Sequence, residues 1–372
     1  MMNPSRTSIL CHALLVLAVN SSPANSQTPA RQDERTTPPT AERFRSQVER
    51  SELRERAIEM LTQLSLSTNP LVRANAIEGL HGAGKRAEDV IRAGLKDDNA
   101  GVRFAAAMTA GKLRLKSSAA FVEALLSDPD PRVRAGALYA LWALGKQTDP
   151  TPLGEFLMDP DPRIRSEAAR VVGLMGNQSA LPMLKSAAAE ADRRNRLMGT
   201  LGDQQAMLER LFQLQVAEAM TRLGDAGASD AIRAALYPSG REGLESCAFA
   251  AHLLGELREE RAAAELVDLV EQATPETAGN QDIRQRSFVQ PKEVRLAAAT
   301  ALAKMGFRDG TYVSQAYASD PDPATRVQVT FLHSASGRPA DLASLATMMD
   351  DPDEMVRAAA AAGVLAAGAR TQ

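Results

Sequence analysis

The sequence predicts an all-α solenoid, a superhelix of about nine stacked antiparallel helix pairs. A stretch that reads as turn, helix and glycine, clearest at residues 128–145, recurs along the chain every 30 or 31 residues, with two longer intervals of 48 and 51. Apolar residues recur at helical spacing within these copies. Only 4% of the residues are aromatic, whereas alanine is abundant, which favours closely packed helices over a β-sandwich. Such periodicity is the signature of a repeat architecture.

The first residues are typical of a secretory signal peptide, which we place at residues 1–26. Arg6 precedes an apolar run over residues 9–19, and Ala24 and Ser26 stand three and one residues before a cleavage site. The run is shorter than the ~20 residues that a membrane span needs. We therefore expect export to the periplasm or outside the cell, and no membrane span once the signal is removed.

Two segments separate the signal from the repeats. Residues 27–40 are rich in Thr, Pro and Gln without a periodic apolar pattern, which predicts a disordered linker. Residues 41–66 have a rough apolar face at helical spacing, which predicts an N-terminal capping helix region. Residues 67–372 then form the repeat solenoid.

Charge and cysteine content limit the partners and the source of stability. The formal net charge is −3, and loss of Arg6 with the signal lowers it to about −4, which argues against a nucleic-acid partner. Cys11 would leave with the signal, so Cys247 would stay alone and no intramolecular disulfide could form. Stability must then come from packing.

Each repeat contains a capped turn followed by an amphipathic helix. In the clearest copy Asp130 can accept the free N–H groups of the first turn, Pro131 suits the first helical position, and Gly145 can end the helix in a left-handed conformation. We index the copies on the position of Arg134. They fall at Arg73, Arg103, Arg134, Arg165, Gln213, Leu244, Arg295, Arg326 and Arg357.

A second apolar segment lies between one glycine and the next turn, for example at residues 119–126. Each unit is therefore a pair of antiparallel helices, A and then B, joined by the Asp-Pro turn. One such pair cannot bury its apolar faces alone, so neighbouring pairs must stack.

The two longer intervals contain inserts near residues 190–203 and 273–290, both between helix A and helix B on the edge of the Asp-Pro turns. The first insert should lengthen both flanking helices. The second reads as an irregular loop, with Pro291 starting the next helix. Long loops in compact folds are often functional, but tolerated insertion at a surface turn explains them equally well.

The pattern Asp-Pro-Asp-Pro-x-Val-Arg-x-x-Ala-x-x-Ala-Leu occurs at Asp128 and Asp159 and more loosely at Asp320 and Asp351. It resembles the HEAT repeat, in particular the short bacterial form named after phycobilisome lyases. The resemblance implies a ladder of turn aspartates and arginines between neighbouring repeats. The implied pairs are Asp130 with Arg134, Asp161 with Arg165, Asp322 with Arg326, and Asp353 with Arg357. Gln213 and Leu244 should interrupt it.

The chain is not expected to be an enzyme. His81, His252 and His333 lie in different B helices, too far apart to ligate one metal. The sequence contains no nucleophile elbow, phosphate loop, Cys-x-x-Cys or His-Glu-x-x-His. We therefore expect no catalytic residues, no metal and no cofactor.

Binding of another protein is the favoured function. In HEAT-like solenoids helix B lines the concave face, and the position five residues after the index lies opposite the core stripe. A candidate partner-binding face is made by that position and one flanking residue: Met108, Tyr139, Trp142, Arg170, Phe249 and Phe331. The alternative is that neighbouring helices cover these side chains.

The last helix, residues 355–369, is nearly all alanine on several faces. A terminal repeat normally has a polar outer surface, so this helix indicates self-association or a weak end. The favoured function is an exported, non-catalytic scaffold that binds a protein through the concave face and the inserted loops. The alternatives are a bilin lyase or isomerase-like activity, from the family resemblance, and a regulatory or sensor scaffold for an envelope enzyme.

Overall fold

The computed structural model describes residues 47–197, 203–237, 243–279 and 286–369. The predicted signal peptide and linker, residues 1–26 and 27–40, lie outside these ranges. Within them every regular element is a helix, and one isolated antiparallel bridge joins Ala273 to Phe288. The all-α prediction is confirmed.

The helices of the described residues alternate between an inner and an outer layer, as the A and B helices of the repeats require. The inner helices are α3 (Pro70–Gly79), α5 (Ala100–Lys112), α7 (Pro131–Ala143), α9 (Pro162–Met175), α11 (Asp203–Arg222), α13 (Leu244–Leu257), α15 (Lys292–Met305), α17 (Pro323–Ser336) and α19 (Glu354–Ala369). The outer helices are α2 (Gln47–Leu64), α4 (Glu88–Gly94), α6 (Ala119–Ala124), α8 (Thr151–Phe156), α10 (Leu181–Leu197), α12 (Ala228–Ala234), α14 (Ala263–Glu271), α16 (Val313–Tyr317) and α18 (Pro339–Met348). Short 3-10 helices join several of them: η2 (Leu80–Ala87), η3 (Lys116–Ser118), η4 (Leu125–Ser127), η5 (Gln178–Ala180) and η7 (Glu260–Ala262).

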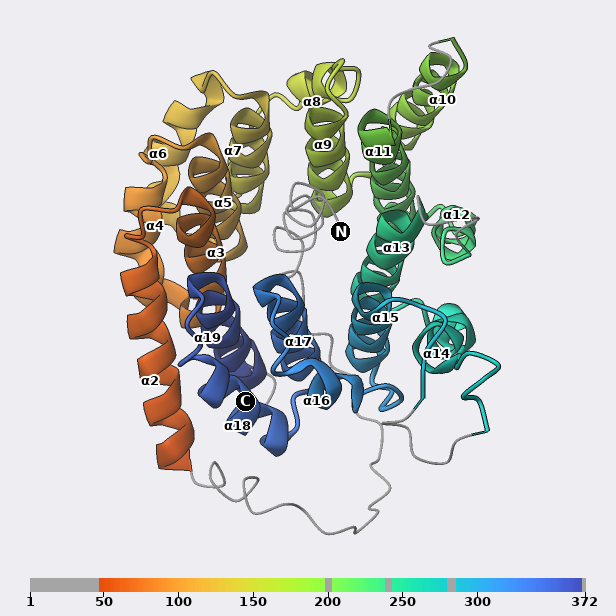
Figure 1. The fold of residues 1–372 in the computed structure, drawn as a ribbon. Coiled ribbons are helices and arrows are strands. Elements are labelled where there is room, and N and C mark those ends of the chain that lie inside the picture. Colours follow the sequence, from red (N-terminus) through yellow and green to blue (C-terminus); the bar gives the residue numbers. More distant parts are fainter. Residues whose placement is uncertain (1–46, 198–202, 238–242, 280–285, 370–372) are drawn as a thin grey trace.

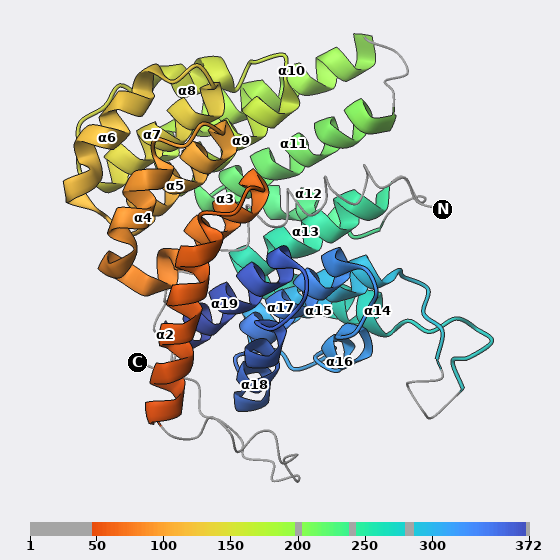
Figure 2. The same ribbon diagram turned by 60° about the vertical axis from the view of Figure 1, so that its left-hand side comes forward.

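The solenoid closes into a ring. Each inner helix packs against the next one along the chain, from α3 through to α19, and α19 then packs against α3 and α2 (Figure 1). The first and last repeats are thus neighbours although almost the whole chain separates them. In the turned view of Figure 2, α19 again lies beside α2. A periodic sequence predicts stacking but not closure, because closure depends on small rotations summed over all repeats.

Closure relies on small residues at the junction between α19 and the first repeat. A Cβ atom on Gly82 would lie 2.5 Å from that of Leu365, and one on Gly79 would lie 2.8 Å from that of Ala362. The hydroxyl of Ser67 donates to Glu354 at 2.8 Å across the same junction. The alanine-rich face is therefore covered within the chain, and our expectation that it is free for self-association is wrong.

The turns between helices are capped as the sequence predicts. The Asp130 side chain accepts from the backbone N–H of Arg132 at 2.8 Å, and Asp161 accepts from that of Arg163 at 2.9 Å. Gly145 then takes a φ of +77° where α7 ends. Arg114, at the matching place in the preceding repeat, has a φ of +51°, so an arginine there carries the strain that glycine avoids.

An arginine ladder runs between repeats, but its partners differ from those implied by the resemblance. Arg103 bonds Asp128 of the next turn at 2.7 and 2.9 Å, and also donates to the backbone oxygen of Asp97 in its own turn at 2.9 Å. Two further pairs have this geometry: Arg73 with Asp97 at 2.8 and 2.9 Å, and Arg326 with Asp351 at 2.8 Å.

The first aspartate of a turn therefore belongs to the ladder, and the second caps the helix. This corrects the pairs named above, because Asp130, Asp161, Asp322 and Asp353 all accept from backbone N–H groups of the helices that they start. The capping carboxylates are held by the helices that they start, and Asp130 also accepts from the Arg132 side chain of its own helix. The first aspartate, Asp128, is the one that meets the arginine of the preceding repeat.

The other predicted ladder arginines find different partners. Arg134 lies over the ring of Phe156, with 5.0 Å between the guanidinium carbon and the ring centroid. Arg165 bonds Glu209 at 2.5 Å and lies over Phe212. Arg357, in the last repeat, donates to two carbonyl oxygens of its own turn.

The two inserts take the forms that the sequence predicts. The first lengthens α10 and α11, which extend beyond the neighbouring helices (Figure 2). The described part of the second contains no helix, and its two ends pair at the bridge between Ala273 and Phe288. There the N–H of Thr274 donates to the carbonyl of Ser287 at 2.8 Å, and the N–H of Val289 donates to that of Gln272 at 3.0 Å. The stretch after residue 285 places Phe288 against the guanidinium of Arg295, with 3.3 Å to the ring centroid.

Replacing Arg103 with alanine should destabilise the protein by about 3 kcal/mol, because it leaves the 5%-exposed Asp128 carboxylate without its ion-pair partner. The matched control is Arg163→Ala. Because the Arg163 side chain is 64% exposed, its loss should lower the free energy of unfolding by less than about 1 kcal/mol. Urea unfolding followed by circular dichroism measures both. Equal shifts in the two variants would contradict a stabilising role for the ladder.

Candidate binding surfaces of the ring

The predicted partner-binding residues all lie on inner helices, but most of them are buried. Met108, Tyr139, Arg170 and Phe249 are at most 8% exposed, whereas Trp142 is 43% exposed at the end of α7. Phe331 is half-buried. The expected exposure is therefore wrong for four of these side chains; the Tyr139 ring, for example, packs against Gly111 of the neighbouring α5. A contact with a partner stays a prediction for Trp142 and Phe331.

A set of charged side chains lies on the inner helices around the ring. The sequence pattern alone did not identify these residues as a set. We name them the inner charged belt: Glu78, Lys112, Arg170, Glu218, Arg222, Glu256 and Lys304. The ammonium of Lys112 lies 3.4 Å from Glu78 on the preceding inner helix, and both side chains are 7% exposed. Lys304 pairs with Glu256, and Arg222 with Glu218. The Lys112 and Lys304 pairs thus join neighbouring helices, whereas Arg222 and Glu218 pair within α11.

Burial changes the proton affinity of this belt. It raises the pKa of Glu78 and Glu218 and lowers the pKa of Lys112. Burial also acts to raise the pKa of Glu256, but Lys304 and His252 outweigh it and hold that pKa below its usual value. The Glu256 carboxylate also favours the charged form of Lys112, although α13 and α5 lie on opposite sides of the ring. The charges therefore converge on the centre.

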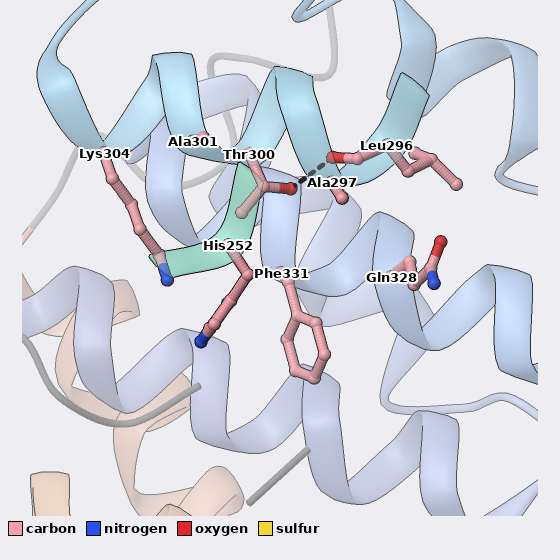
Figure 3. A pocket seen from close by; sticks show the side chains of 8 residues that line it. All are labelled: His252, Leu296, Ala297, Thr300, Ala301, Lys304, Gln328 and Phe331. Atoms are coloured by element: carbon pink, nitrogen blue, oxygen red, sulfur yellow. Dashed lines mark hydrogen bonds between the residues drawn. The ribbon is translucent and has the colours of Figure 1, made fainter. Parts of the chain in front are cut away.

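A small cavity lies between α13, α15 and α17, and Figure 3 shows the side chains around it. Its volume of about 20 Å³ accommodates a single water molecule and no cofactor. The hydroxyl of Thr300 donates to the carbonyl of Leu296 at 2.7 Å, whereas the amide oxygen of Gln328 is buried without a hydrogen-bond partner. A water bound there would satisfy it.

The three histidines outside the predicted signal peptide lie in separate elements, and none belongs to a candidate metal centre within the described ranges. In those ranges no group of three or more His, Cys, Asp and Glu side chains could hold a metal ion. His81, His252 and His333 lie on η2, α13 and α17. His333 is 3% exposed, and its Nδ1 atom lies 2.7 Å from a carboxylate oxygen of Asp341. This is the environment of a histidine packed in the core. Of the helices in the described ranges, none combines the length and apolarity of a membrane span.

Exposed apolar side chains recur at the turns along one edge of the ring. The described residues include eight large apolar side chains that are at least 36% exposed, and five of them precede the start of an inner helix. We name these five the turn-edge residues: Leu66, Leu126, Met158, Tyr237 and Val289. Both inserts lie on the same edge. Each of the five lies in the turn of a different repeat, so they form a row along this edge and not one patch.

The sequence and fold were compared with known proteins. A family model of HEAT repeats matches residues 55–142, 118–200 and 289–364, which together make up more than half of the chain. The search of curated proteins found no match to the sequence of this chain.

The solved structures that are similar to this one include the following three. Human deoxyhypusine hydroxylase in complex with glycerol is 18% identical, with a TM-score of 0.35 over 77% of this chain and 98% of that chain. The complex of CpcE and CpcF of phycocyanin lyase from Nostoc sp. PCC7120 is 17% identical, with a TM-score of 0.39 over 84% and 100%. An engineered protein is 14% identical, with a TM-score of 0.31 over 88% and 98%.

Burial and the neighbouring Lys112 ammonium lower the pKa of His81 to about 4. Between pH 6.5 and 4 the unfolded chain binds a proton that the folded chain does not, so stability should fall as the pH falls through this window. His81→Gln should lose less stability than the native chain between pH 7 and pH 4.5, as measured by urea unfolding at each pH. An equal loss of stability in His81→Gln and in the native protein would disprove the lowered pKa of His81.

Proposed function

The chain belongs to the HEAT-repeat proteins, and we propose that it is an exported, non-catalytic scaffold that binds another protein along the turn edge of its ring. The observation that carries this proposal is the row of exposed side chains along one edge, made by Leu66, Leu126, Met158, Tyr237 and Val289. Burial of such side chains is a main source of binding free energy between proteins.

The inner face is less suited to a protein partner than the sequence alone implies. Its aromatic side chains are largely buried, and the acids and bases of the inner charged belt already pair with one another. A partner that entered the centre would have to separate these buried pairs, which costs several kcal/mol for each charge left alone. The turn edge carries no such cost.

The lengthened α10 and α11 favour the same edge. They project beyond the neighbouring helices on the side of the turns (Figure 2). Their described ends are polar, with Glu190 bonded to Arg193 at 2.8 Å and to Arg194 at 3.0 Å. These charged ends lie on the same edge as the turn-edge residues, and protein interfaces commonly combine apolar contacts with polar ones.

The binding edge can be identified with a photo-crosslinking amino acid at single positions. Leu126 and Met158, on the turn edge, are 37% and 36% exposed, and Phe307, on the opposite edge, is 37% exposed. Placed at Leu126 or Met158 in living cells, the crosslinker should give one discrete adduct with another protein, whereas at Phe307 it should give none. The readout is a shifted band identified by mass spectrometry.

Adducts from Phe307 alone would contradict the proposed edge. The identity of the crosslinked protein also distinguishes between the alternative functions. If it is an envelope enzyme, the regulatory or sensor scaffold is favoured. A colour change on adding an open-chain tetrapyrrole to the purified protein would favour the bilin lyase-like activity instead.

Export rests on residues 1–26 and has its own test. In a cell fraction released by osmotic shock, the mature protein should begin at Gln27, because cleavage follows Ser26. Leu15→Arg places a charge in the apolar run and should keep the uncleaved chain in the cytosol. A native chain that stays in the cytosol with residues 1–26 attached would contradict export.

A further inference from the structure

A second cavity lies on the inner side of the ring, where α3, α5 and α9 approach one another. Its volume of about 310 Å³ is at the lower end of the range for small-molecule sites. The wall contains apolar side chains, including Leu71, Phe104 and Met108. Glu78, Arg132 and Arg170 are among its polar residues.

Arg170 is the unusual member of this wall. The residue is only 2% exposed, and its Nη1 atom is buried without a hydrogen-bond partner. Its Nε atom donates to Glu167 at 3.1 Å, and its guanidinium lies over the ring of Phe104, with 5.6 Å to the centroid. A buried donor left unpaired costs about 1–3 kcal/mol, so a ligand atom that accepts from Nη1 would recover that free energy.

A second guanidinium stands at the same cavity. Arg132 uses its Nε and Nη2 atoms on the Asp130 carboxylate, at 3.1 and 2.6 Å, which leaves its remaining nitrogen available. This side chain is 39% exposed, so it lies nearer the solvent than Arg170. An acceptor group could therefore reach both arginines from the open side.

The charges around the cavity limit what that acceptor can be. Two arginines face two acids, Glu78 and Glu167, which also line the wall. A dianionic phosphate would be repelled by these acids, whereas a single carboxylate matches the planar guanidinium and adds only one charge. The apolar wall then requires an apolar group beside the carboxylate.

We propose that this cavity binds a carboxylate attached to an apolar group, either the C-terminal residue of a peptide or a small free acid. The carboxylate accepts from Nη1 of Arg170 and from Arg132, and the apolar group packs against Phe104 and Met108. The wall includes the first residues of α3 and α5, so the cavity lies close to the turn edge, but it contains none of the five turn-edge residues. The proposal therefore does not depend on a protein partner at that edge.

Calorimetric titration of the purified protein tests the proposal with four probes: N-acetyl-leucine, its amide, N-acetyl-Ala-Ala-Leu and its amide. Each acid should bind at least tenfold more tightly than its amide, because a hydrogen bond to a charged group is worth about that much. Preference for the tripeptide acid identifies a peptide C-terminus, and equal binding of the two acids identifies a small acid. Inorganic phosphate should bind more weakly than either acid.

Variants connect the binding to this cavity. Arg170→Gln should weaken binding of the acids at least tenfold, whereas Arg222→Gln, a change in the inner charged belt outside the cavity wall, should leave it within twofold. Ala105→Leu fills the cavity without changing charge and should also abolish binding, which keeps the test valid if Arg170→Gln fails to fold. Equal binding of acids and amides, tighter binding of phosphate, no binding of any acid at millimolar concentration, or native affinity in Ala105→Leu would overturn the proposal.

Discussion

The packing of α19 against α2 and α3 is the contact on which the rest of this structure depends. A solenoid normally needs polar caps at both ends, because its terminal repeats expose the surfaces that bury one another elsewhere. Here the two ends cover each other: Ala358, Ala360 and Leu365 of the last helix are at most 1% exposed. The apolar interior is therefore continuous around the ring, and the end repeats need no cap of their own.

Closure also explains why charge gathers at the centre. Once the inner helices face one another, their polar side chains lose water and must find partners on neighbouring helices. Glu78 with Lys112 and Glu256 with Lys304 achieve this, and the arginine ladder does the same at the turns. Arg170 is the exception, since one of its nitrogen atoms stays unpaired beside a cavity. The belt is otherwise structural, and the cavity beside Arg170 is the candidate ligand site.

The local features of the fold could be predicted from the sequence, because they depend on neighbouring residues. The Asp130 cap, the lengthened α10 and α11, and the irregular second insert follow from turn chemistry and helical periodicity. The partners of the ladder arginines could not be separated by spacing, since Asp128 and Asp130 are both plausible from the pattern. Closure of the ring could not be predicted either, because it sums small rotations over all the repeats.

The most direct test of ring closure is the distance between the first and last repeats in solution. Spin labels at Arg56→Cys and Asp350→Cys, two exposed residues that pair across the junction, would report it in a chain whose two own cysteines are replaced by alanine. Loss of this exposed pair should cost little stability. Electron–electron resonance should give one short, narrow distance distribution. A long or broad distribution would mean that the solenoid is open, and would contradict the account given above.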